Sequence, residues 1–137
     1  MAHLARSVAT LRIFGDDLLP EDVSSMLAGS PTRAERKGEV IRTKAGERVA
    51  STGAWRLEAS ATEPEHLDAQ VAELLGQLTP NLETWRALGE RYRLDLFCGW
   101  FMKESNEGVS VSPATLLALG NRGIELGLDI YAPSQDA

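Results

Sequence analysis

The chain has 137 residues, of which 43% are hydrophobic and 25% charged. This length and composition predict one globular domain with a single core, spanning residues 1–137 and ordered from about residue 6 to residue 132. The 14 basic and 20 acidic residues give a formal net charge of −6, which disfavours binding to nucleic acids and to anionic membrane surfaces.

The cellular compartment is suggested by three features of the sequence. No apolar run is long enough to cross a bilayer, and the first ten residues lack the pattern of a secretory signal. The only cysteine, Cys98, cannot form an internal disulfide. It lies in the apolar run 96–100, where we expect a buried thiol without redox or catalytic function. A reducing cytoplasm fits these features best.

The first predicted elements are a strand and a short helix. Apolar side chains at alternate positions predict a strand over residues 8–14. The Gly-Asp-Asp sequence at 15–17 predicts a turn. Pro20 is suited to the first turn of a helix, and Gly29 is the expected end of that helix.

Residues 30–52 break the pattern and predict a long loop that is partly a β-hairpin, with its tip at 44–47. Alternation resumes over 55–59, which predicts a second strand. A helix is then expected from Pro64, with a leucine and valine stripe that ends at Leu78.

The second half is predicted to contain a helix over 82–92 and the longest strand over 94–102. A turn at 105–108 favours a hairpin with 109–111 as the returning strand. Ser112 and Pro113 then predict the start of a helix. Its expected buried stripe is Leu116, Leu117 and Leu119, and the last strand is predicted over 124–131.

These elements predict an α+β fold with a mostly antiparallel sheet and helices packed on one face. A strand followed by a Pro-started helix occurs twice, at 14–27 and 111–119. This repetition suggests two related halves that share one sheet, each resembling half of a ferredoxin-like unit.

Several short motifs occur in an order that resembles the bacterial family catalogued as domain of unknown function 4279. They are Arg12-Ile13-Phe14-Gly15-Asp16-Asp17-Leu18 with Pro20, then Pro31-Thr32, Lys37-Gly38 and Trp55, and finally Leu126-Gly127-Leu128-Asp129-Ile130-Tyr131. The resemblance spans nearly the whole chain. It implies a stand-alone bacterial cytoplasmic protein and brings no established catalytic residues.

The polar face of the predicted sheet is the first candidate site. If the strands pair in register, aromatic and charged side chains project from it together, beside small residues that leave room. They are Arg12, Phe14, Arg56, Glu58, Asp95, Phe97, Phe101, Asp129 and Tyr131. This face is either a binding surface or is covered by the loop 30–52 or by a second copy of the protein.

A second candidate combines acids and bases near the first turn. Asp16 and Asp17 follow a strand, where one carboxylate could act as a general base, and Arg33, Arg36 and Lys37 could bind an anion. The simpler interpretation is that the aspartates form the turn and that the bases neutralise nearby acids, in pairs that contribute about 0–1 kcal/mol.

No metal or cofactor is expected. The only histidines, His3 and His66, are far apart in sequence, and the acids around His66 are typical of a helix start. No glycine-rich phosphate loop or nucleophile motif is present. The three tryptophans fall on apolar stripes and are expected in the core.

Two functions remain open. The first is a non-enzymatic domain that binds another protein or itself. One form of this hypothesis is an immunity-like role, since acidic surfaces can occlude basic active sites. The alternative is an enzyme acting on a small molecule or anion, with Asp16 or Asp17 as the base and Arg33 or Lys37 as the charge-stabilising group. Whether the protein is an enzyme is left undecided, with the binding function favoured.

Overall fold

The computed structural model describes residues 6–133, and within that range the chain forms four helices and seven strands. In chain order they are β1 (Arg6–Gly15), α1 (Pro20–Leu27), β2 (Arg33–Glu35), β3 (Val40–Thr43), β4 (Gly46–Val49), β5 (Gly53–Glu58), α2 (Leu67–Leu75), α3 (Leu82–Arg91), β6 (Arg93–Phe101), α4 (Pro113–Asn121) and β7 (Glu125–Tyr131).

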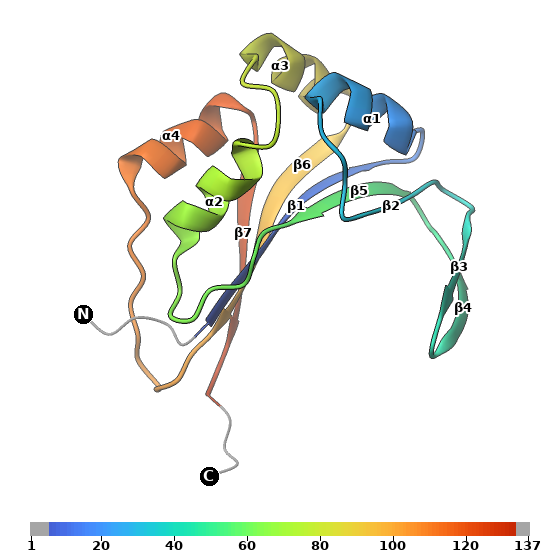
Figure 1. Cartoon of the computed structure of the whole chain (residues 1–137). Coiled ribbons are helices and arrows are strands. Elements are labelled where there is room, and N and C mark those ends of the chain that lie inside the picture. The colour runs from blue at the N-terminus through green and yellow to red at the C-terminus, as the bar shows by residue number, and fades with distance from the viewer. Residues whose placement is uncertain (1–5, 134–137) are drawn as a thin grey trace.

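The main sheet has five strands in the order β2-β5-β1-β6-β7, and β3 pairs with β4 in a separate hairpin. All neighbours in the main sheet are antiparallel except β6 and β7, which are parallel. Figure 1 shows the helices on one side of the curved sheet, with the opposite side open. The predicted α+β fold is confirmed, and the sheet is mixed. We call the helix-free side of the sheet the concave face.

The core lies between the sheet and the helices, and strand alternation explains its composition. Leu11 pairs with Leu57 on one side and with Leu96 on the other, so the three leucines point together toward the helices. Trp55 and Trp85 are fully buried, as the sequence predicts, and Trp100 is nearly so. Each large apolar side chain buried in this layer stabilises the fold by about 1.5–3 kcal/mol.

The helices begin close to their predicted starts and are capped by nearby polar groups. α1 starts at Pro20 and ends with Ala28 in the left-handed conformation, at φ 55°, one residue before the predicted end at Gly29. α2 begins at Leu67 and not at Pro64, because His66 is its N-cap and accepts a bond from the Ala69 N–H.

The start of α4 is fixed by a contact with α2. The Ser112 hydroxyl accepts a hydrogen bond from the Thr115 N–H at 3.1 Å, which confirms the predicted cap. Asp68 of α2 accepts from the Thr115 hydroxyl at 2.6 Å and from the Ser112 N–H at 3.2 Å. These bonds hold the pKa of Asp68 below its usual range, although burial acts in the opposite direction.

The predicted hairpin partner at 109–111 is wrong. Residues 102–112 form no strand, and the edge of β6 that they would occupy is taken by β7. The Glu107 carboxylate accepts the backbone N–H groups of Lys103 and Glu104, which closes the turn locally. The chain then returns along the molecule to start α4, so that β7 can pair in parallel with β6 (Figure 1).

The prediction of two ferredoxin-like halves is not confirmed. After α1 the chain passes through β2 and the β3–β4 hairpin before it reaches β5, which is antiparallel to β1, whereas after α4 it returns directly as β7, which is parallel to β6. The two strand–helix units therefore differ in their pairing.

Apolar side chains on α4 and β7 are more exposed than predicted. On α4, Leu119 is buried but Leu116 and Leu117 are exposed, because the helix meets the sheet along only one narrow side. On β7 the even-numbered residues share the helix side, as predicted, but only Leu126 packs against the core. Leu128 and Ile130 are exposed.

The segment 30–52 contains the predicted hairpin and one strand that was not predicted. β3 and β4 pair across the tip at Thr43 and Gly46, and β2 adds a three-residue edge to the main sheet. Figure 1 shows the β3–β4 hairpin projecting beside the concave face and not lying across it. The segment 30–52 therefore does not cover the concave face, which was one of the predicted alternatives.

Candidate binding surface on the concave sheet face

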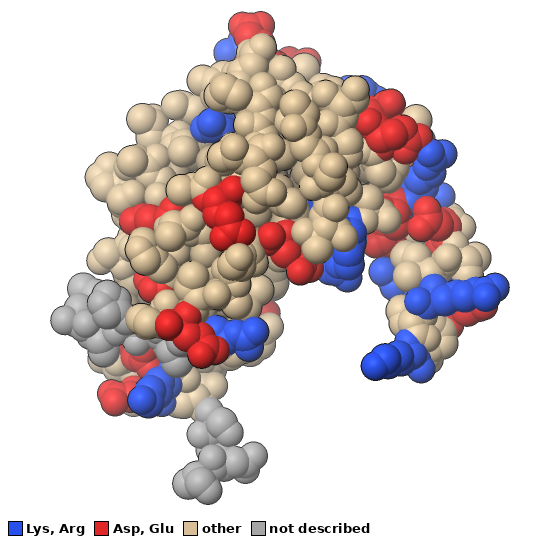
Figure 2. Space-filling view, in the orientation of Figure 1, with Lys and Arg blue, Asp and Glu red and all other residues tan. Residues whose placement is uncertain are grey.

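Strand register brings the predicted polar side chains together on the concave face. Arg12 of β1 is opposite Arg56 of β5 and opposite Asp95 of β6. Phe101 of β6 is opposite Tyr131 of β7. Residues directly opposite each other project from the same face of a sheet, so the predicted grouping is correct. Figure 2 shows the hollow on the concave side of the curved sheet, with basic and acidic residues along its wall.

Arg12 and Asp95 form a two-pronged ion pair at the centre of the face. Arg12 Nε donates to Asp95 Oδ1 at 2.8 Å, and Nη2 donates to Oδ2 at 2.7 Å. The side chains are 28% and 17% exposed. The Arg12 guanidinium also lies 4.5 Å from the Phe97 ring centre and 5.1 Å from that of Phe14. The hydrogen bond to Asp95 raises the pKa of Arg12 despite partial burial.

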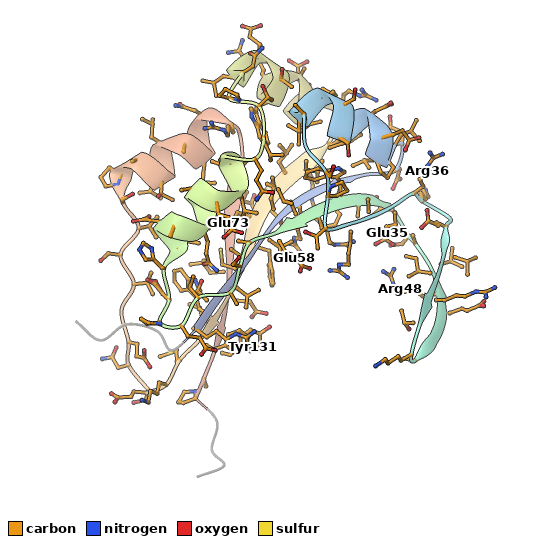
Figure 3. The ribbon with its side chains drawn as sticks, in the orientation of Figure 1. Glu35, Arg36, Arg48, Glu58, Glu73 and Tyr131 are labelled. Carbon is orange, nitrogen blue, oxygen red and sulfur yellow. The ribbon has the colours of Figure 1, made fainter. Side chains whose placement is uncertain are left out.

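Glu35 of β2 is the most deeply buried acid of the surface. Its side chain is only 7% exposed, and it accepts from Arg56 Nη1 at 2.7 Å. Arg48 of β4 reaches the same carboxylate, with Nη1 3.3 Å from Oε2. Burial opposes ionisation, but the hydrogen bonds from the two arginines outweigh it and lower the pKa of Glu35. Figure 3 shows Glu35 and Arg48 at the junction of the sheet and the hairpin.

The Phe14 ring is surrounded by three guanidinium groups. Arg12, Arg56 and Arg93 lie 5.1, 5.6 and 5.9 Å from its centre, distances at which cations are attracted to the ring. Arg12 and Arg56 each have a carboxylate partner, whereas Arg93 forms no ion pair with any residue between 6 and 133. An open cavity of about 440 Å³ lies here, lined by Arg12, Phe14, Gly15, Asp16, Thr52 and Arg93.

The far end of the face is aromatic. The Phe101 and Tyr131 rings stack with centres 4.8 Å apart and an interplanar angle of 10°, and the Arg6 guanidinium lies 5.5 Å from the Phe101 ring. A side chain at Gly99 would contact both rings, at 3.6 and 3.7 Å. The Tyr131 hydroxyl donates to Asp129 at 2.7 Å, which raises the pKa of Tyr131.

The second predicted cluster separates into ion pairs. Lys37 Nζ lies 3.3 Å from Asp16 Oδ2, both side chains being exposed, while Arg36 pairs with Glu21. Arg33 lies on β2 and pairs with Glu58 at 3.5 Å. The neutralising interpretation accounts for all three contacts. Asp16 also lines the cavity beside Phe14, so the enzyme alternative stays a prediction that rests on Asp16 and Lys37. Asp17 is exposed and lies outside that cavity.

Sequence reasoning did not identify Arg93 and Glu35 as parts of the surface. Arg93 has the same parity on β6 as Asp95 and Phe97, so the strand pattern contained a signal for it. Glu35 lies on a strand of only three residues, which periodicity cannot identify.

Comparison with known proteins gives one match. The family model described as "Domain of unknown function (DUF4279)" matches residues 4–133. The chain belongs to the DUF4279 family. No curated protein and no solved structure matches it. The matched range runs from before β1 to after β7, so every strand of the concave face lies inside the DUF4279 domain.

Other candidate groups in the DUF4279 domain have structural positions. His66 caps α2, and His3 lies outside the described residues. No three His, Cys, Asp or Glu side chains between residues 6 and 133 are grouped as metal ligands would be. Cys98 is buried in the core, and burial raises the pKa of its thiol to about 12. None of the helices in the described range has the length and apolar character of a membrane span.

Proposed function

We propose that this domain is a non-enzymatic protein-binding domain, whose concave face receives an acidic segment of another protein. The observation that carries the proposal is an arginine without an ion-pair partner in the described chain that lines the open cavity beside the Phe14 ring. Arg93 lies 5.9 Å from the Phe14 ring and has no carboxylate partner in the described chain. A guanidinium in this position presents a planar fork of donors that matches a carboxylate.

The surroundings of Arg93 favour binding with little ordering cost. The neighbouring Arg12 and Arg56 are already held by Asp95 and Glu35, so these side chains lose little freedom when a partner docks. Surfaces that are ordered before binding retain more of the gross interaction energy as affinity. Arginine and aromatic residues are also the types that carry most binding energy at protein interfaces.

The second contact point is the Phe101–Tyr131 stack at the other end of the face. Arg93 and Phe101 are the two ends of β6, which places them about 26 Å apart at about 3.3 Å per residue. An extended segment of about eight residues would span this distance. We therefore propose a partner segment with an acidic side chain at one end and an apolar side chain at the other.

The immunity-like role stays a finer proposal. It rests on the net charge of −6 and on the small size of the chain. The concave face does not add to its support, because its charges are mixed. Arg93 has no carboxylate partner in the described chain, while Glu125 and Asp129 of β7 lie on the same face without an arginine or lysine partner there. A basic toxin would have to meet a different, acidic surface.

The proposal is tested by selecting peptides from a displayed random library on the immobilised domain. We expect the selected sequences to be enriched in Asp and Glu. Arg93→Gln should weaken the selected peptides by about 10- to 100-fold, because it removes charge-assisted hydrogen bonds worth about 1.5–3 kcal/mol. Phe101→Ala should weaken peptides that carry an apolar residue at the far end.

The matched control is Arg86→Gln, since Arg86 is an exposed arginine on α3, in the helix layer. Selected peptides should bind this variant as they bind the wild type. Recovery of peptides without acidic enrichment, or equal binding to wild type and Arg93→Gln, would contradict the proposal.

A further inference from the structure

The edge of the sheet at β7 has no neighbouring strand among residues 6–133. β7 is the last strand in the sheet order, so one side of its backbone has no partner in the described chain. It is seven residues long, and Leu128 and Ile130 on it are 43% and 54% exposed. A long edge strand with exposed apolar side chains readily pairs with another strand.

The opposite edge of the sheet differs in a way that singles out β7. β2 has only three residues, and its charged members Arg33 and Glu35 are engaged in ion pairs with Glu58 and Arg56. Short, charged edges are the usual means by which proteins prevent strand pairing. β7 contains no lysine, arginine or proline. β7 is longer than β2, and its only charged residues are Glu125 and Asp129, so it is the less protected edge of this sheet.

The backbone groups that are free on β7 can be identified by parity. The Met102 N–H donates to the Tyr131 carbonyl at 3.0 Å, so Tyr131 directs its carbonyl toward β6. Successive residues of a strand direct their backbone groups to opposite sides. The even-numbered residues Leu126, Leu128 and Ile130 therefore present their N–H and C=O groups at the free edge.

We propose that two copies of the chain associate through antiparallel pairing of their β7 strands, about a twofold axis at Leu128. In this register Leu128 is opposite its own copy, and Leu126 is opposite Ile130 of the second chain. All three are residues with free backbone groups, so each opposed pair exchanges two hydrogen bonds, about six in total. The apolar side chains of these residues share the helix side of the sheet and would pack against one another.

The same register is favoured by charge. It places Asp129 opposite Gly127 of the second chain and Glu125 opposite Tyr131. Moving the axis to Asp129 would set two aspartates against each other, and moving it to Gly127 would set Glu125 against Asp129. Like charges directly opposite each other destabilise a strand pair. The axis at Leu128 is also the one that pairs all seven residues of β7.

The resulting dimer would join the five strands of each protomer into one continuous sheet. Its interface is isologous, so it closes after two copies and does not extend into a fibre. It uses the backbone edge and the helix side of β7, and it leaves Arg93 and the Phe14 cavity accessible. The inference therefore does not depend on the proposed function.

The test is sedimentation equilibrium on the full chain. Two substitutions at Gly127 introduce opposite charges and should change the dimer dissociation constant in opposite directions. A Cβ at Gly127 would meet only the Leu96 carbonyl oxygen, at 3.9 Å, so a side chain fits there. Gly127→Lys would place a lysine opposite Asp129 twice in the dimer and should tighten it about 2- to 30-fold, at about 0.2–1 kcal/mol for each pair. Gly127→Glu should weaken it by a similar factor.

A backbone variant gives an independent test. Leu128→Pro removes an N–H that faces the free edge and leaves the pairing with β6 intact, which is where edge strands tolerate proline. We expect this variant to fold and to dimerise at least tenfold more weakly. The matched control is Val49→Lys, since Val49 is an exposed apolar residue of β4, in the separate β3–β4 hairpin. It should leave the dimer constant unchanged.

Three outcomes would overturn the inference. The first is a monomer at the highest soluble concentration, and the second is a dimer that responds equally to Gly127→Lys and Gly127→Glu. The third is a dimer weakened by Arg93→Gln as strongly as by Gly127→Glu, which would assign self-association to the concave face. Circular dichroism of each variant separates loss of pairing from loss of fold, and the Gly127 pair decides the matter if Leu128→Pro does not fold.

Discussion

Removal of the Arg12–Asp95 ion pair should destabilise the protein more than removal of an exposed pair. We consider Arg12→Met, which keeps an apolar stem over the Phe14 and Phe97 rings, Asp95→Asn, and the double variant. Each single substitution leaves one charge of a partly buried pair without its partner, and the double substitution removes both charges. The cycle therefore isolates the energy of the pair itself.

The magnitude follows from the geometry of the pair. Two unit charges about 4 Å apart attract by about 4 kcal/mol at an effective dielectric constant of 20, which suits partly exposed sites. Exposed fractions of 28% and 17% mean that most hydration of Arg12 and Asp95 has been lost, and this cost offsets about half of the attraction or more. We expect each single variant to lose about 2–3 kcal/mol of unfolding free energy, with a coupling of about 1–2 kcal/mol.

Urea unfolding followed by tryptophan fluorescence measures these energies, since Trp55 and Trp85 are fully buried in the fold. The control cycle uses Arg42 and Glu47, an exposed pair of the β3–β4 hairpin with 3.2 Å between its charged atoms. Its coupling should be about 0–0.5 kcal/mol. A coupling for Arg12 and Asp95 no larger than this control would refute the view that partial burial gives the central pair its strength.

Two further predictions concern buried titratable groups. Glu35→Gln should cost about 2 kcal/mol at pH 7. The pKa of Glu35 is lowered in the fold, so its contribution is complete above the unfolded value of about 4.3 and is lost as pH falls through the folded value. Urea titrations from pH 7 to pH 3 should therefore show the difference narrowing, and a constant difference would contradict this. Cys98, with its pKa raised to about 12, should react with an aromatic disulfide reagent at pH 8 only in urea, and rapid reaction of the folded protein would disprove its burial.

The strands and the grouping on the concave face could be predicted because they depend on a period of two. Once residues 8–14 and 94–102 are recognised as strands, parity alone assigns Arg12, Asp95 and Phe97 to the face opposite the apolar residues. Strand neighbours then determine which of these side chains meet. The sequence does not reveal the order of the strands in the sheet. In every strand pair of this sheet, however, the side chains lie on the faces that parity assigns to them.

The predictions that were wrong, and the strand that was not predicted, concern features that depend on contacts between residues distant in sequence. The turn after β6 suggested a hairpin, but the parallel strand β7 occupies that edge, and nothing local at 109–111 excludes pairing. The short β2 pairs with β5, and its Glu35 accepts a hydrogen bond from Arg56, 21 residues away. The exposure of Leu116 and Leu117 depends on how much of the sheet α4 covers, which helical periodicity does not reveal.

The net charge of the chain and the charge of its concave face have different consequences. A net charge of −6 acts over distance and opposes the approach of an acidic partner, but salt screens it beyond about 8 Å at physiological ionic strength. Once the partner is in contact, the charges close to the binding surface determine whether it is attracted or repelled. Beside the Phe14 ring, Arg12 and Arg56 are each matched by an acid, so Arg93 is the charge that a partner would meet at that point of the face. The acidic composition therefore predicts slow association with an acidic segment, and it does not argue against the bound state.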